Sequence, residues 1–207
     1  MRFTTLKILV FLIGTIVSAQ QKSPSLLNNK ALHPYETLIR DWLKCYDISV
    51  DKFDFVSTNS LTLSESVFNP QNTYMRIYFP YCRISPDRHQ CIDVSSYHYL
   101  FKKDSLGRTI SEGMQVDSAV KLFIPPEKKQ FRLLFAGSQT RFDDAFWLDN
   151  QHLIVVGGEY LYRFVPEIWL IDLNLNKIDF YMYITVLPRY PKCNYKKIKY
   201  PDVIFPD

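Results

Sequence analysis

The chain has 207 residues, of which 47% are hydrophobic and 22% charged, so it is long enough to bury a sizeable core and too apolar to remain disordered. Aromatic residues make up 15% of the chain, and such enrichment favours strands. The formal net charge of +4 is too small to support binding to nucleic acid or to an anionic membrane by charge alone.

The N-terminal segment, residues 1–19, has the features of a secretory signal peptide. Arg2 and Lys7 precede or flank an apolar run at residues 8–17, and small residues then lead to Ala19. The run is too short to span a bilayer. We therefore expect cleavage after Ala19 and a mature protein that is periplasmic or secreted, with no membrane span. The alternative interpretation is a buried N-terminal helix or strand.

A single mainly-β domain is expected over residues 20–207, and a helix over residues 34–46 should open it. Pro34 stands in the first turn, where its missing N–H costs nothing. Apolar residues then recur at steps of three and four, which predicts one apolar stripe; they are Leu38, Ile39, Trp42, Leu43 and Tyr46. We expect this amphipathic helix to pack on a face or edge of a sheet, in preference to binding a partner.

After the helix, apolar and polar residues alternate, as is typical of strands. Strands are expected near residues 52–57 and 60–65, and residues 73–81 are also strand-forming by composition. Pro80 removes one ladder donor from this third segment, so we place it at a sheet edge or a bulge. It begins a first antiparallel meander over residues 73–136.

A second meander is predicted over residues 142–186. Its short apolar runs end in residues that form turns, which is the signature of consecutive hairpins. One run closes with Gly157 and Gly158, and the end of a strand is the simplest explanation of this pair. The remaining residues, 187–207, are expected to form a solvated, extended tail.

The two meanders align with each other. Residues 84–94 and 147–156 each place an Asp-containing turn between two strands, and residues 119–124 resemble residues 167–172. Repeated meanders of this size are the sequence mark of propeller blades.

Two segments resemble the blade repeats of TolB-like and WD40-like β-propellers. The Ser-Pro-Asp sequence at 85–87 and the strand at 91–94 resemble the turn and second strand of a blade, although Arg88 stands where the repeats have Gly. Residues 168–173 resemble the third strand. The resemblance implies blade-like sheets, as a partial propeller or as stacked sheets. Residues 84–183 are also similar to small exported proteins of Bacteroidota that have no assigned activity.

Four cysteines fit two disulfides in an exported protein. A symmetric turn at residues 85–88 would place Cys82 opposite Cys91, at bridging distance. Cys45 and Cys193 would form the second pair and tie the tail to the N-terminal segment. Three connectivities are possible, and buried free thiols are the alternative.

No motif in the sequence predicts catalysis, a cofactor or a metal. The histidines do not form the short-range pairs typical of metal ligands; they are His33, His89, His98 and His152. We therefore expect a non-catalytic binding or interaction module for an unknown protein or glycan. Alternating tyrosines supply the candidate ligand patch, with burial in the core as the alternative; they are Tyr97, Tyr99, Tyr160 and Tyr162.

The alternative function is a carboxylate-dependent hydrolase that acts on an extracellular polymer. Such an enzyme needs two carboxylates that flank the bond to be cleaved. The spacing selects no pair, so the candidates remain Asp87, Asp93, Asp143, Asp144 and Asp149.

Overall fold

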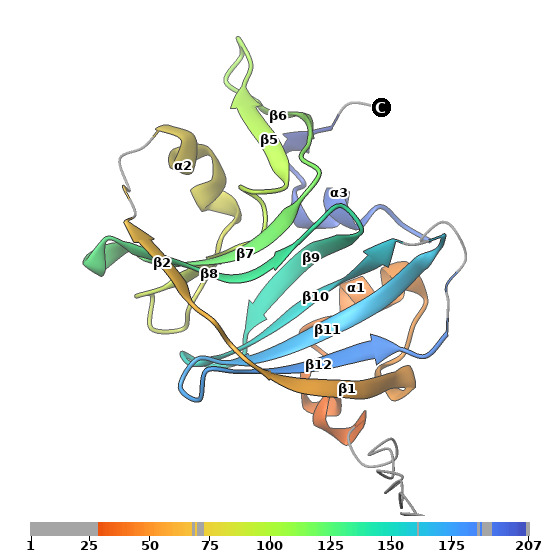
Figure 1. Ribbon diagram of the computed structural model, residues 1–207. Helices are drawn as coiled ribbons and strands as arrows, with labels where there is room; N and C mark the ends of the chain where they lie inside the picture. The colour runs from red at the N-terminus through yellow and green to blue at the C-terminus, as the bar shows by residue number, and fades with distance from the viewer. Residues whose placement is uncertain are drawn as a thin grey trace, which may run out of the picture.

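The computed structural model in Figure 1 describes residues 29–67, 69, 73–160, 162–185, 187 and 192–205. The signal peptide expected at residues 1–19 lies outside these described residues. The described chain is mainly β, as predicted, and is built around antiparallel sheets. Its helices are all too short or too polar to cross a membrane.

The first sheet is a meander with one added edge strand. Its order is β1-β12-β11-β10-β9, and all neighbours pair antiparallel. The strands are β9 (Thr140–Trp147), β10 (His152–Tyr160), β11 (Phe164–Asp172), β12 (Lys177–Tyr183) and β1 (Phe53–Ser60). Strand β10 continues through Gly157 and Gly158, so the expectation that this glycine pair ends a strand is wrong.

The second sheet has the same connectivity as the first. Its order is β2-β8-β7-β4-β3. Four strands, β3, β4, β7 and β8, again lie side by side in chain order, and a strand from earlier in the chain, β2, pairs with the last of them. The strands are β3 (Arg83–Ile84), β4 (Cys91–Asp93), β7 (Ser118–Ile124), β8 (Lys129–Ala136) and β2 (Ser64–Val67). The two halves that align in sequence thus form sheets of one topology, and the described strands do not close into a propeller.

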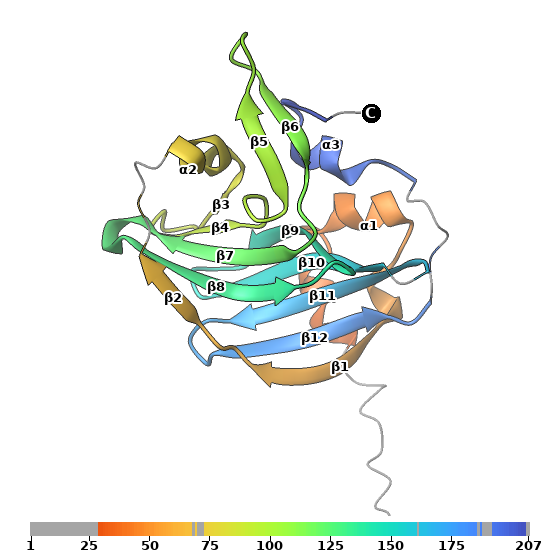
Figure 2. The same cartoon turned by 45° about the horizontal axis from the view of Figure 1, so that its top comes forward.

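An apolar core joins the two sheets. Its buried members come from both sheets and from Leu61; they include Ile92, Val120, Leu122, Phe142, Leu153, Val155 and Ile171. Residues 61–63 carry the chain from β1 in one sheet to β2 in the other, which is visible in Figure 2. The strands expected at 52–57 and 60–65 are these two, although both end later than predicted.

A short helical layer covers the outer face of the first sheet (Figure 1). It comprises η1 (Asn29–Ala31), η2 (His33–Tyr35), α1 (Arg40–Tyr46) and η3 (Val50–Lys52). The helix predicted over 34–46 is therefore α-helical only from Arg40, after a 3-10 turn that contains Pro34. Trp42 and Leu43 of α1 are buried against Ile154 and Ile168 of the sheet.

The strand predicted at residues 73–81 is wrong, because this segment is helical: α2 (Thr73–Tyr78) followed by η4 (Phe79–Tyr81). The buried hydroxyl of Tyr78 donates to the Tyr99 carbonyl at 2.7 Å and accepts from the Phe101 N–H at 3.0 Å. These tertiary contacts outweigh the strand propensity of the aromatic residues. Pro80 suits the start of the 3-10 turn, where no N–H is needed.

A third, smaller sheet stands away from the other two (Figure 1). Its order is β13-β6-β5, with β5 (Tyr99–Lys103), β6 (Thr109–Met114) and β13 (Val203–Ile204). The expectation of a solvated, extended tail is thus wrong for the described part of residues 187–207. That part forms α3 (Tyr195–Lys199) and β13, with Tyr195, Tyr200 and Val203 buried.

The predicted Cys82–Cys91 disulfide is also wrong, because both residues are buried free thiols. Cys91 faces Ile84 across the β3–β4 hairpin, two residues away from the expected partner. The turn is centred one residue later than expected, because Ser85 pairs with Gln90 and the loop comprises residues 86–89. Arg88 in this loop adopts a positive φ of 61°.

Candidate functional site

Two consecutive aspartates on β9 organise the site. The ladder between β10 and β9 shifts its register at Gly157, with Val156 facing Asp144 and Gly157 facing Phe142. This β-bulge leaves Asp143 as the extra residue, so both carboxylates point to the outer face of the sheet. Their neighbours Phe142 and Ala145 point to the opposite side, into the core between the sheets.

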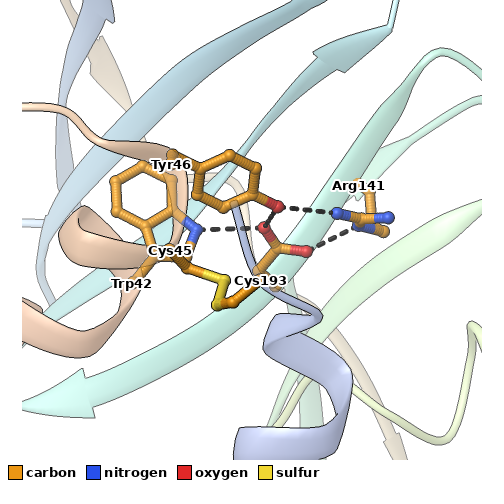
Figure 3. Close-up of a disulfide and its surroundings, with 6 residues drawn as sticks. Trp42, Cys45, Tyr46, Arg141 and Cys193 are labelled. Carbon is orange, nitrogen blue, oxygen red and sulfur yellow. Dashed lines mark hydrogen bonds and ion pairs between the residues drawn. A yellow bond between two sulfur atoms is a disulfide. The ribbon is translucent and has the colours of Figure 1, made fainter. Parts of the chain in front are cut away.

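The carboxylate of Asp143 anchors helix α1 (Figure 3). It accepts hydrogen bonds from Trp42 Nε1 at 3.0 Å and from the Tyr46 hydroxyl at 2.9 Å. Arg141 Nε donates to its other oxygen at 2.5 Å, and Arg141 Nη2 donates to the Tyr46 hydroxyl at 3.0 Å. Arg141 therefore neutralises a buried carboxylate while it is itself held in one orientation.

The carboxylate of Asp144 anchors the C-terminal segment. Arg83 contacts both of its oxygens, at 3.1 and 2.6 Å, Lys199 Nζ lies at 2.9 Å, and the Tyr195 hydroxyl donates at 3.0 Å. Burial acts to raise the pKa of Asp144, but Lys199 and Arg83 outweigh it and hold that pKa below its usual value. Asp144 thus remains charged although its side chain has no solvent exposure.

A disulfide joins the two anchored segments, which confirms the predicted Cys45–Cys193 pair. Cys45 lies on α1, and Cys193 lies two residues before Tyr195, where α3 begins. Figure 3 shows the bond beside the side chains of Trp42 and Tyr46. Helix α1, strand β9 and the 192–199 segment are therefore fastened together by one covalent bond and two buried carboxylates.

A pocket of about 440 Å³ opens where these elements meet. Its lining residues come from α1, β9, β10 and the C-terminal segment; they are Tyr46, Arg141, Tyr160, Lys192, Cys193, Asn194, Tyr195 and Lys196. We call it the Arg141 pocket. Its lining contains three cations and three phenols but no carboxylate.

The electrostatics of the Arg141 pocket are set by burial and by its cations. Burial first, and then the charge of Arg141, lower the pKa of Lys196. Burial also raises the pKa of Tyr160, so this phenol stays protonated. The guanidinium of Arg141 stacks 5.1 Å from the centre of the Tyr160 ring. The pocket can therefore offer charged and neutral hydrogen-bond donors beside an aromatic surface.

Comparisons with protein-family models, curated proteins and solved structures found no match.

The four tyrosines of the predicted ligand patch lie in different surroundings. Tyr160 lines the Arg141 pocket and is 37% exposed, whereas Tyr162 lies beyond it and is 99% exposed. Tyr99 is buried in an aromatic cluster with Tyr78 and the C-terminal segment. Tyr97 packs edge-on against a residue of β8. The structure therefore brings only one of the four, Tyr160, to the pocket.

The five carboxylates proposed for the hydrolase have structural roles. Asp93 is buried and accepts hydrogen bonds from the backbone of two serines that follow it. Asp87 and Asp149 lie in turns and accept backbone N–H groups. Asp143 and Asp144 are neutralised as described above, and none of the five lines the Arg141 pocket. In the described part of the chain, no cluster of histidine, cysteine and acidic residues is arranged to hold a metal.

No pattern in the sequence predicts Arg141, Lys196 or Asn194 as site residues. Lys196 and Asn194 belong to the tail, which is expected from the sequence to be solvated. The sequence Arg141-Phe142-Asp143-Asp144 could have indicated the site. It places three charged residues inside a predicted strand, and charged side chains that become buried need partners of opposite charge or hydrogen bonds. The tail supplies two of those partners, Tyr195 and Lys199.

Proposed function

We propose that the protein is an exported, non-catalytic binding module and that its ligand occupies the Arg141 pocket. The observation that carries this proposal is the fixed geometry of the pocket. Asp143 and Tyr46 hold Arg141 in place, and the Cys45–Cys193 disulfide holds the segment that bears Lys196. A site whose side chains are already ordered loses less entropy when a ligand binds.

The disulfide supports export. Disulfides persist in oxidising compartments such as the periplasm and the extracellular space, and they are rare in the cytosol. Cys45 is 2% exposed, so the bond is protected by the packing of α1. This agrees with the leader expected at residues 1–19.

The alternative, a carboxylate-dependent hydrolase, has less support. Its two carboxylates would have to face a substrate, about 5–9.5 Å apart. Asp143 and Asp144 are adjacent on β9, but each is occupied by cations and hydroxyls from neighbouring elements. The resemblance to propeller blades agrees better with an interaction role, and we keep it as part of the proposal.

A ligand screen with matched tyrosine variants tests the binding role. The melting temperature of residues 20–207 would be measured with panels of oligosaccharides and short peptides. A ligand of the Arg141 pocket should stabilise the wild type and Tyr162→Ala, but not Tyr160→Ala. Tyr162→Ala is the matched control because Tyr162 lies two residues away and outside the pocket.

Two outcomes would contradict the proposal. One is that every stabilising compound acts equally on Tyr160→Ala and Tyr162→Ala. The other is that a stabilising oligosaccharide is cleaved during incubation, as measured by mass spectrometry, and that cleavage is lost when one of the candidate aspartates is replaced. The second outcome would favour the hydrolase.

A further inference from the structure

We infer that the Arg141 pocket recognises an oxyanion, that is, a carboxylate, phosphate or sulfate group of its ligand. This inference rests on the proposed function, because it names the ligand class of the same pocket. Three features of the described side chains carry it: the balance of charge, the free edge of the guanidinium and the state of the phenols.

The pocket has more positive charge than its surroundings neutralise. Arg141 forms an ion pair with Asp143, and Lys192 forms one with Asp47 at 2.6 Å. In the part of the chain described, no carboxylate forms an ion pair with Lys196, and its ammonium lies 5.2 Å from the centre of the Phe205 ring. Because burial and Arg141 both lower the pKa of Lys196, an anion bound between the two cations would remove an existing repulsion.

Arg141 is oriented to bind a planar or tetrahedral oxyanion. A guanidinium carries five N–H donors in a fixed fork, and the hydrogen bonds with Asp143, Tyr46 and Tyr160 do not use all of them. The side chain is 20% exposed, and it lines the pocket. A fork of this kind matches the oxygens of carboxylates and phosphates better than a neutral hydroxyl group.

One phenol of the pocket, Tyr160, adds a neutral donor, because the hydroxyls of Tyr46 and Tyr195 already donate to Asp143 and Asp144. Burial, followed by the charge of Asp143, raises the pKa of Tyr46, and burial raises the pKa of Tyr160. Both therefore remain protonated at neutral pH and do not add negative charge. The ring of Tyr160 also provides a flat apolar surface for the part of the ligand that carries the oxyanion.

Titration calorimetry on residues 20–207 at constant ionic strength tests the inference. The probes are inorganic phosphate, sulfate, citrate, and the pair glucuronate and glucose, which differ by a carboxylate. At least one oxyanion should bind saturably at one site. Lys196→Gln should weaken this binding about tenfold, as expected for the loss of one charge-assisted contact.

Lys197→Gln is the matched control, since it removes the same charge from the same short helix and Lys197 does not line the pocket. It should change the affinity by less than about twofold. Arg141 is not replaced, because its loss would leave Asp143 buried without a cation and destabilise the fold.

The outcomes separate the ligand sources and the two hypotheses. Binding of phosphate or sulfate alone indicates an ester ligand, and binding of glucuronate without glucose indicates an acidic sugar; both support the inference. Equal weakening by Lys196→Gln and Lys197→Gln overturns it. If no oxyanion binds but a neutral oligosaccharide does, and Tyr160→Ala abolishes that binding, the oxyanion inference is wrong and the binding module stands. If no probe binds, the oxyanion inference is wrong.

Discussion

Asp144 is the residue whose charge most depends on the rest of the molecule. Its side chain has no solvent exposure, and its partners Arg83, Lys199 and Tyr195 come from two distant segments. A buried carboxylate is tolerated only when cations and hydrogen bonds replace water. Lys199 is itself only 3% exposed, so replacing Asp144 removes the carboxylate that neutralises this buried ammonium.

We predict that Asp144→Asn lowers the free energy of unfolding by about 3–5 kcal/mol, the usual cost of breaking a buried ion pair. The amide keeps the shape of the carboxylate but leaves Lys199 and Arg83 with excess charge. Urea denaturation followed by tryptophan fluorescence measures the change. Asp202→Asn, at an exposed position in a turn, should stay within about 0.5 kcal/mol; equal effects of the two variants would contradict the role of Asp144.

His152 makes a second, exposed charge cluster whose effect depends on pH. Its Nδ1 lies 2.8 Å from Asp149 and its Nε2 lies 3.3 Å from Asp172. The hydrogen bond to Asp149 and the charges of both aspartates raise the pKa of His152. Since the folded pKa exceeds the unfolded value near 6.5, the contact stabilises the fold fully below about pH 6.5, and this contribution is lost as pH rises through the folded pKa.

The stability difference between the wild type and His152→Gln should therefore be larger at pH 5.5 than at pH 8.5. Solvent screening limits this change to about 0.2–1 kcal/mol. Urea midpoints at the two pH values measure it. His89→Gln serves as the control, because His89 lies farther from its carboxylate neighbour, 3.9 Å from Asp87. Its effect on stability should change less between the two pH values. A difference that grows with pH would refute the assignment.

At the scale of elements, the bulge on β9 depends on a glycine in the facing strand. A Cβ on Gly157 would lie 2.1 Å from the carbonyl oxygen of Arg141. Only glycine permits this close approach of two backbones. Strand β10 therefore keeps a glycine in its interior, and the bulge that it permits turns Asp143 toward α1.

Gly157→Ala should destabilise the protein by more than about 2 kcal/mol, because backbone must move to admit the methyl group. It should also weaken the binding of any ligand in the Arg141 pocket, since Arg141 lies on β9 next to the β-bulge. Gly137→Ala is the comparison: its Cβ would come no nearer than 4.0 Å to a side-chain atom of Asp117, and the expected change is within about 0.5 kcal/mol. Equal urea midpoints for the two variants would exclude the proposed role of the bulge.

The elements that sequence patterns identified are those in which local signals and burial agree. Short apolar runs closed by turn residues located the strands between residues 142 and 186, close to β9–β12. The segment at 73–81 was mispredicted because contacts of Tyr78 with β5 decide its conformation. The site was largely missed for a similar reason. Tyr160 was found because it alternates with Tyr162 in the sequence, whereas Arg141 and Lys196 meet only through tertiary structure.

At the scale of the whole molecule, the Cys45–Cys193 disulfide closes a loop with a sequence separation of 148 residues. A cross-link of this length should stabilise the fold by about 2–5 kcal/mol, chiefly by restricting the unfolded chain. The double variant Cys45→Ala/Cys193→Ala should lose this amount in urea denaturation. Dithiothreitol should lower the stability of the wild type but not that of the variant; the same response in both would show that the disulfide contributes little.

The adjacent carboxylates on β9 also constrain when the protein can finish folding. Asp144 precedes Tyr195 by 51 residues, which is about 3–10 s of synthesis at ribosomal rates. During that interval the nascent chain contains the aspartate but neither Tyr195 nor Lys199. Burial of β9 is therefore disfavoured until translation has passed residue 199. If the chain is exported as proposed, this delay would help to keep it unfolded for translocation, and the first sheet would be completed on the far side of the membrane.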